Sequence, residues 1–275
     1  MQKRQAARTG ADDLGEFWYW LFPAGFAFAL LAYAIALKIR VYAVVDTVWT
    51  LGLGLGALLY FACSGAASGR ATAAFFVLLV WSGRLSLHLL RDRVLAGRED
   101  PRYAALASRW GSRAKFKFLF VFLAQIPLVA LFLLPVTIAM GNDVPAWRFL
   151  DSLAVLIAIT ALLGEFLADR QLAEFRSKPG NAGKVCQEGL WRYSRHPNYF
   201  FEWLHWFAYL VFAVGAQAFW LSLIGPVMMY LFLRYITGIP FAERSSLKSR
   251  GDAYKNYQKT TNAFFPWRPQ QVRNS

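Results

Sequence analysis

Ionisable residues interrupt four apolar stretches of this chain, where a lipid bilayer disfavours them. Asp46 lies in YAVVDTVWTLGLG, and Arg84 and His88 lie in VWSGRLSLHLLR. Glu202 lies in HPNYFFEWLHW, and Arg234 lies in YLFLRYITG. A charged residue at membrane depth costs about 2.5–3.5 kcal/mol on insertion scales, so such residues normally face the interior of a helix bundle and mark functional sites. The sequence therefore predicts a membrane protein with a polar cavity.

Polarisation of a carbonyl oxygen is the first chemistry that these residues allow. Tyr42 and Asp46 lie one helical turn apart on an expected membrane span. A desolvated carboxyl group tends to keep its proton, so Asp46 is a candidate acid or hydrogen-bond donor, and His88 is a second one. Two donors that converge on a carbonyl oxygen stabilise an enolate, as reduction of an enone requires. The structural alternative is a buried ion pair between Asp46 and Arg84.

A row of arginines points to an anionic ligand. Arg84, His88 and Arg91 have the spacing i, i+4, i+7, which predicts one stripe on a helix, and Arg98 and Arg102 continue it. Arginine binds phosphate with two parallel hydrogen bonds. The stripe therefore predicts a ladder of donors from a buried site to phosphates at its mouth.

A second constellation follows in RHPNYFFE. Asn198, Glu202 and His205 share the spacing i, i+4, i+7, and Asp169 and Arg176 lie seven residues apart on the preceding segment. Asparagine and glutamate together supply the donors and acceptors that recognise an amide or a ribose edge. Taken singly, Asp169 and Arg176 are also compatible with a charge at a helix end and a solvated side chain.

Membrane helices are the elements that must position these residues. The chain has 275 residues, of which 57% are hydrophobic, and a span needs about 20 apolar residues. Seven spans are expected, near residues 17–37, 41–62, 71–90, 118–140, 147–168, 199–215 and 218–238. Segments 93–116, 169–198 and 241–268 are expected to contain helical pieces outside the membrane. The predicted fold class is an all-α integral membrane protein with seven transmembrane helices in a single membrane domain, 1–275.

The net charge of +14 is spread unevenly between the two sides of the membrane. Of the 30 lysines and arginines, 23 fall on the side that holds the C-terminus and 5 on the side that holds the N-terminus. The positive-inside rule then places the N-terminus outside and the C-terminus in the cytoplasm. The chain has no helix-turn-helix or zinc-finger pattern, so no nucleic acid partner is expected. Cys63 and Cys186 fall on opposite faces, and no metal site is expected from the three separated histidines.

Gly52, Gly54 and Gly56 in TLGLGLGALL look superficially like a dinucleotide fingerprint. That motif needs a turn between a strand and a helix in a βαβ unit, whereas these glycines lie inside a hydrophobic helix. They favour close packing of helices instead.

The segment GLWRYSRHPNYFFEWLHW completes a family pattern. Together with the preceding DRQLAEFRSKPG and the following E-x10-Y-x2-Y-x5-FFPW, it resembles the C-terminal domain of the steroid 5α-reductase superfamily over about residues 160–267. VVDTVWTLGLG and RLSLHLLRDRVLAGREDPRY resemble bacterial members more loosely. The resemblance implies an NADPH-dependent 3-oxo-5α-steroid 4-dehydrogenase, which reduces the Δ4 C=C bond of 3-oxo-steroids or similar enone lipids by hydride transfer.

The resemblance also implies roles for individual residues. Asp46 occupies the position of the acid that holds the ketone, and His88 occupies the position of a family tyrosine, whose hydrogen bond an imidazole can also donate. Tyr42, where a tryptophan is usual, and Arg84 are expected beside the substrate. The positions expected to bind NADPH are Arg91, Arg98, Asp169, Arg176, Lys184, Tyr193, Asn198, Glu202, Glu243 and Tyr254.

Two other functions account for part of the same pattern. Isoprenylcysteine-type methyltransferases also carry R-H-P-x-Y and a following glutamate on a membrane helix, but they bind S-adenosylmethionine and do not need Asp46. A lipid carrier or membrane scaffold would use the basic face for topology alone. For the reductase, we expect a monomer in a bacterial inner membrane, or in the endoplasmic reticulum of a eukaryote, with a lipid substrate that arrives from the bilayer.

Overall fold

The computed structural model describes residues 10–65 and 68–270. Residues 1–9 and 271–275, which hold four of the basic residues counted above, lie outside the described residues. Contacts divide the chain into two compact units. Unit 1 contains Met1–Asp151 and Phe212–Ile224, and unit 2 contains Ser152–Val211 and Gly225–Ser275.

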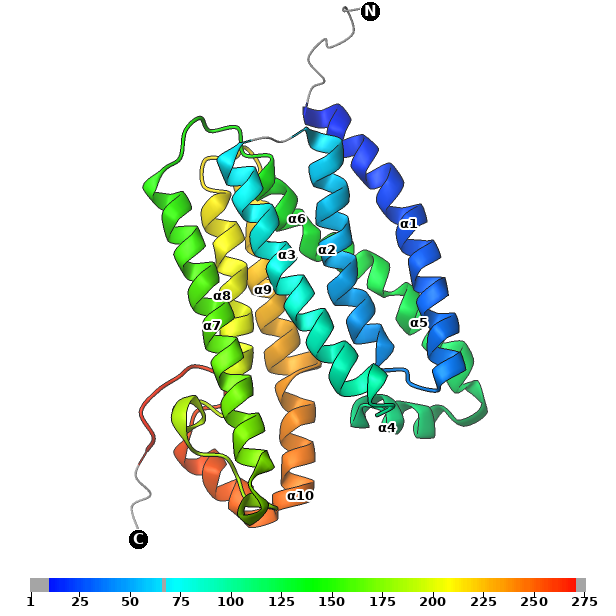
Figure 1. Cartoon of the computed structure of the whole chain (residues 1–275), viewed down its shortest axis with the longest axis vertical. Coiled ribbons are helices and arrows are strands. Elements are labelled where there is room, and N and C mark those ends of the chain that lie inside the picture. The colour runs from blue at the N-terminus through cyan, green and yellow to red at the C-terminus, as the bar shows by residue number, and fades with distance from the viewer. Residues whose placement is uncertain (1–9, 66–67, 271–275) are drawn as a thin grey trace, which may run out of the picture. The chain divides into compact units, whose positions relative to one another are not determined.

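Unit 1 is built from helices, most of them apolar (Figure 1). They are α1 (Gly10–Ile39), α2 (Val44–Ser64), α3 (Gly69–Leu89), α4 (Pro101–Trp110), α5 (Ala114–Leu123) and α6 (Gln125–Met140). A π-helix, Leu90–Leu95, continues α3, and a 3₁₀ turn, Gly111–Arg113, separates α4 from α5. Local signals fix these ends. Gly65 takes a left-handed conformation after α2, the Ser68 hydroxyl accepts from the Ala71 N–H at the start of α3, and Pro101 begins α4 behind the N-cap Asp100.

The glycines of α2 permit the close helix packing that the sequence predicts. A Cβ atom at Gly54 would lie 2.4 Å from the Ser82 Oγ of α3, and one at Gly56 would lie 2.3 Å from a Leu133 methyl group of α6. The Ser82 hydroxyl donates to the Thr50 carbonyl at 2.7 Å. Bare backbone at these positions therefore brings α2 against both of its neighbours.

One buried ion pair fastens α3 to the start of α7 (Phe149–Ser177). Arg70 is 3% exposed and Asp151 is fully buried. The Arg70 Nε donates to Asp151 Oδ1 at 2.7 Å, and its Nη2 donates to Oδ2 at 2.9 Å. The Arg70 guanidinium also donates to three backbone carbonyls of the connecting loop, those of Asn142, Val144 and Ala146.

Unit 2 holds most of α7, together with α8 (Pro197–Phe212), α9 (Ile224–Leu231), a π-helix (Phe232–Ile236) and α10 (Ile239–Thr260). Segment 169–198 continues α7 and then breaks into 3₁₀ turns at Pro179–Asn181 and Gly189–Arg192, as expected. After α10 the chain is extended. It follows the loop before α8, because the Arg195 N–H donates to the Asn262 carbonyl and the Trp267 N–H to the Tyr193 carbonyl, both at 2.9 Å.

Six helical stretches in the described residues are long and apolar enough to cross a membrane. They overlap six of the seven expected spans, so the chain is an all-α, multi-pass membrane protein. The remaining span, expected at 199–215, corresponds to α8, which has 16 residues. Such a helix is about 24 Å long, less than the hydrocarbon core of about 30 Å. The count of seven spans and the orientation of the termini stay predictions.

Candidate functional site

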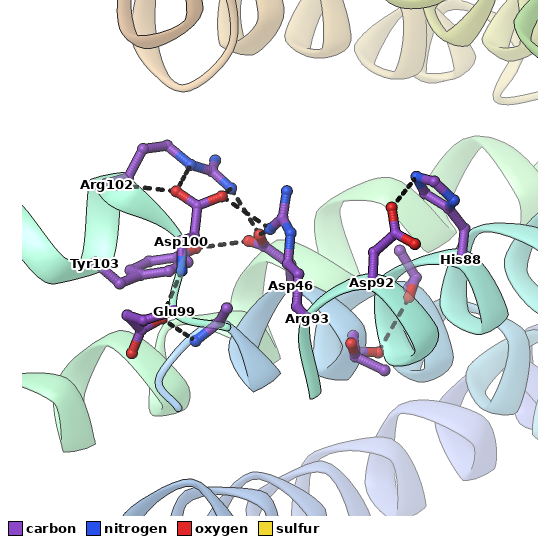
Figure 2. A network of polar contacts seen from close by, with 11 residues as sticks. Asp46, His88, Asp92, Arg93, Glu99, Asp100, Arg102 and Tyr103 are labelled. Carbon is purple, nitrogen blue, oxygen red and sulfur yellow. Dashed lines mark hydrogen bonds and ion pairs between the residues drawn. The ribbon is translucent and has the colours of Figure 1, made fainter. Parts of the chain in front are cut away.

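A polar cluster in unit 1 is centred on Asp46 in the first turn of α2 (Figure 2). Asp46 Oδ2 accepts a hydrogen bond from Arg102 Nη2 at 2.7 Å and a short one from Arg93 Nη1. Asp46 Oδ1 accepts from the Tyr103 hydroxyl at 2.6 Å. The Asp46 side chain is 23% exposed. Its carboxylate is thus an acceptor for three donors that come from the π-helix and from α4.

Asp100 completes the cluster as a second carboxylate. Its Oδ1 accepts from Arg102 Nε at 2.9 Å, and its Oδ2 lies 3.1 Å from Arg93 Nη1. Burial raises the pKa of Asp100, but the Arg102 hydrogen bonds and the charges of both arginines outweigh it and hold that pKa below its usual value. Asp100 therefore stays ionised beside the two guanidinium groups at neutral pH.

Glu99 fastens the same loop to the start of α2. Its side chain accepts from the backbone N–H groups of Tyr42 at 2.6 Å and Ala43 at 2.9 Å. These donors precede the first turn of α2, where a negative charge also interacts favourably with the helix dipole. The Tyr42 ring is stacked on Phe118, with ring centroids 3.7 Å apart.

His88 and Asp46 do not converge in this structure. Figure 2 shows His88 turned toward Asp92, with 3.7 Å between His88 Nε2 and Asp92 Oδ2, while Asp46 is turned toward Arg93 and Arg102. The His88 side chain is 46% exposed. The side-chain positions in unit 1 therefore do not show the predicted arrangement, in which Asp46 and His88 point toward one carbonyl oxygen.

The π-helix explains where the arginine stripe departs from its prediction. The Arg98 N–H donates to the Arg93 carbonyl at 2.9 Å, an i to i+5 bond, so the turn after Leu89 is wider than an α-turn. Arg91 and Arg98 are exposed, whereas Arg93 reaches Asp46. Asp46 forms ion pairs, as the structural alternative expected, but its side chain is partly exposed rather than buried, and its partners differ from the expected one. Arg84 is half-buried on α3, and the Asp46 pairs are with Arg93 and Arg102.

In unit 2, the second constellation comes together at the junction of α7 and α8. The Asn198 Nδ2 donates to Asp169 Oδ1 at 3.1 Å, across 29 residues of sequence. Glu202, one turn further along α8, is 7% exposed. The His205 Nε2 and the Tyr209 hydroxyl share a hydrogen bond of 2.8 Å. A buried carboxylate and an amide thus lie on one side of α8, as their spacing predicts.

Basic side chains lie on the surface of the same unit. Arg176, Lys184 and Tyr193 are exposed, as expected for a surface that receives a ligand from water. Arg176 lies within electrostatic range of both Arg250 and Asp169, and the Arg250 Nε donates to the Lys184 carbonyl at 2.9 Å. Holding like charges close together is unfavourable unless a counter-charge is near. This group is therefore suited to an anion.

Glu243 is occupied by groups of its own chain. Its Oε1 lies 2.6 Å from Arg195 Nη2, and its Oε2 accepts from Gln258 Nε2 at 2.9 Å. Tyr254 is 4% exposed. Both side chains connect α10 to the loop before α8. Glu243 and Tyr254 were expected to contact the cofactor, and in the structure they support the site instead.

His196 makes the stability of this support depend on pH. Burial lowers the pKa of His196, and the charges of Arg195 and Arg234 lower it further, against the opposing effect of Glu243. Its Nε2 lies 3.5 Å from Glu243 Oε1. An unfolded histidine has a pKa of about 6.5. The unfolded chain therefore binds the proton first as pH falls, and stability is lost below about pH 6.5.

We expect thermal unfolding in detergent to show this loss between about pH 7 and the folded-state pKa of His196. The variant His196→Asn removes the titrating ring, so its melting temperature should depend less steeply on pH in that window. An identical slope in both proteins would show that another group controls the acid sensitivity.

Several residues of these clusters lay outside the sequence prediction. The only sequence signal near Arg93, Asp100 and Tyr103 was the helix start D-P-R-Y, which lies in the segment that resembles the family loosely. Arg195 lies in the loop before α8, and Gln258 lies near the end of α10. No local sequence pattern predicts that both contact Glu243. No group of three or more His, Cys, Asp or Glu residues suited to a metal ion occurs in the described parts of the chain.

Comparison with known proteins gives one match. The model of a family described as "Protein of unknown function (DUF1295)" matches residues 32–261, which include both polar clusters. Searches of curated proteins and of solved structures found no significant match.

Proposed function

Because this chain belongs to the DUF1295 family, which is related to steroid 5α-reductase-like membrane proteins, we propose that it is an NADPH-dependent reductase of an enone lipid. The observation that carries the proposal is the hydrogen bond between Asp169 and Asn198. This hydrogen bond joins two separate sequence segments that resemble the family, and both of its residues are expected to bind the cofactor. The finer assignment, to the Δ4 bond of 3-oxo-steroids, rests on the resemblance alone.

The residues of unit 2 fit a dinucleotide phosphate. Arg176, Lys184 and Arg250 supply positive charge at an exposed surface, where guanidinium groups bind phosphate oxygens well. Asn198 and Glu202 supply the polar groups for an amide or a ribose edge. When bound, NADPH supplies the hydride, and the protein supplies position and charge.

The residues of unit 1 act on the carbonyl group of the enone. Asp46 orients the guanidinium groups of Arg93 and Arg102 and the hydroxyl of Tyr103. The N–H groups of Arg93 and Arg102 that Asp46 leaves free hold the carbonyl oxygen as negative charge develops on it, whereas the Tyr103 hydroxyl donates its one hydrogen to Asp46 and His88 is turned toward Asp92. Asp46 then acts through its neighbours, because its own oxygens already accept three hydrogen bonds.

The cytoplasmic face is the basic one, so NADPH binds there and the C-terminus lies on the same side. The substrate arrives from the bilayer, the protein acts as a monomer, and its membrane is the bacterial inner membrane. These statements follow from the charge distribution and the resemblance.

Binding of NADPH to the purified full chain tests the proposal. The double variant Arg176→Ala/Arg250→Ala should weaken NADPH binding at least about tenfold, since hydrogen bonds to charged groups contribute about 1.5–3 kcal/mol each. Arg170→Ala is the matched control, because Arg170 lies on the same helix and pairs with Glu174 at 2.6 Å. It should leave the dissociation constant unchanged.

Turnover of progesterone with NADPH, followed at 340 nm, completes the test. Binding of S-adenosylmethionine in place of NADPH would assign the RHPNYFFE residues to methyl transfer. Binding of neither nucleotide would contradict both enzymes and favour a lipid carrier or scaffold.

A further inference from the structure

An apolar cavity of ≈ 210 Å³ lies within unit 1, between α1, α2 and the start of α6. Leu21 and Phe28 of α1 form one wall, Val48 and Leu59 of α2 form another, and Ile126 of α6 closes the third. Neither of the polar clusters described above contributes a residue to it. Gln125 is the polar side chain in the lining, and its Nε2 already donates to the Val121 carbonyl at 2.8 Å.

The cavity is lined by residues along much of α2. Its lining on α2 runs from Val48 to Leu59, which is about 16 Å along the helix axis. An engineered protein cavity of about 150 Å³ is filled by one benzene molecule, so ≈ 210 Å³ spread over that length admits a slim group. Gly25 lines it on α1, where a Cβ atom would meet the Ile126 side chain only at 3.4 Å.

The cavity lies among apolar helices that are long enough to cross a membrane. Its helices belong to three of the membrane-length stretches. Leu55 lines the cavity and is also 51% exposed, so the cavity wall reaches the outer surface of these helices. Apolar cavities stay dry and accept apolar guests. In a bilayer, the apolar molecules at hand are the tails of lipids.

We propose that this cavity binds a single hydrocarbon chain, such as an acyl or isoprenoid tail. A planar fused-ring body needs width along the whole cavity, whereas a chain needs only length. The α2 lining begins at Val48, two residues after Asp46, so a chain in the cavity starts at the level of the Asp46 cluster and extends along α2.

Two molecules could supply such a chain. One is a bilayer lipid that fills the space permanently, and the other is the tail of the enone substrate. The second source rests on the proposed function, whereas chain binding itself does not. The test therefore uses labelling of the protein as its readout rather than turnover.

The probe is palmitic acid with a diazirine at the end of its tail, photolysed with the full chain in detergent, and labelled peptides are located by mass spectrometry. In Gly25→Leu the new side chain occupies the cavity, where a Cβ would meet the Ile126 side chain at 3.4 Å or more. Labelling of the α1 and α2 peptides should fall at least fivefold. Ala27→Leu, on the exposed side of the same helix, is the matched control and should keep full labelling.

Equal labelling of Gly25→Leu, Ala27→Leu and the unchanged chain would overturn the proposal, provided that all three melt at similar temperatures. Competition identifies the source of the chain. Displacement of the label by a long-chain enone at concentrations where phospholipid has no effect would assign the cavity to the substrate tail, and displacement by phospholipid alone would assign it to a bilayer lipid. A failed NADPH assay would leave the binding of a hydrocarbon chain intact and would remove only its assignment to the tail of a substrate.

Discussion

Replacement of Asp151 by asparagine is expected to lower the free energy of unfolding by about 3–5 kcal/mol, the cost of removing one partner of a buried ion pair. The change keeps the shape of the side chain but leaves the Arg70 charge uncompensated at 3% exposure. Two hydrogen bonds to Arg70 and one to the Arg148 N–H also lose a charged acceptor. Denaturation of the purified protein in mixed micelles measures the difference.

Two controls separate charge burial from general damage. Glu174→Gln breaks the exposed pair with Arg170 and should leave stability unchanged, because solvent screens such pairs. The double variant Arg70→Met/Asp151→Leu removes both charges and should be more stable than Asp151→Asn alone. If Asp151→Asn were as stable as the unchanged chain, the pair would contribute nothing to the fold.

The helices were predictable because their signals are local. Length and apolar content located α1, α2 and α3, and Pro179 and Gly180 marked the end of α7. Pro101 marks the boundary between two helical pieces, where α4 begins behind the N-cap Asp100. Span 118–140 was expected to be continuous, whereas the structure separates α5 from α6 at Ala124.

The site was predictable only where the pattern follows regular helical spacing. Asn198 and Glu202 lie on one side of α8, and Asp169 meets Asn198, as their spacing and the resemblance indicate. Spacing failed beyond Leu89, because the π-helix changes which arginine faces Asp46. Pairing across 81 residues, as between Arg70 and Asp151, leaves no local signal at all.

The largest effect on activity is expected at Asp46. Asp46→Asn should lower turnover by more than about tenfold, a loss typical of a positioned catalytic group. The amide carries no negative charge, so Arg93, Arg102 and Tyr103 lose the acceptor that orients them toward a carbonyl oxygen. Binding of NADPH should stay unchanged, because Asp46 contacts Arg93, Arg102 and Tyr103, none of which is expected to hold the cofactor. Turnover and the NADPH dissociation constant are therefore measured on the same preparation.

Comparison among variants then decides between two roles for Asp46. Tyr103→Phe removes one of its three donors and keeps both ion pairs, so it should lower turnover less than Asp46→Asn if the arginines that Asp46 positions hold the carbonyl group. His88→Ala should also cost more than tenfold if His88 holds the carbonyl group, whereas Asp252→Asn, on the exposed surface of α10, serves as the unaffected control. Normal turnover in both Asp46→Asn and His88→Ala would exclude carbonyl polarisation by these residues. In that case the Asp46 cluster would serve only to fasten the loop before α4 to the start of α2.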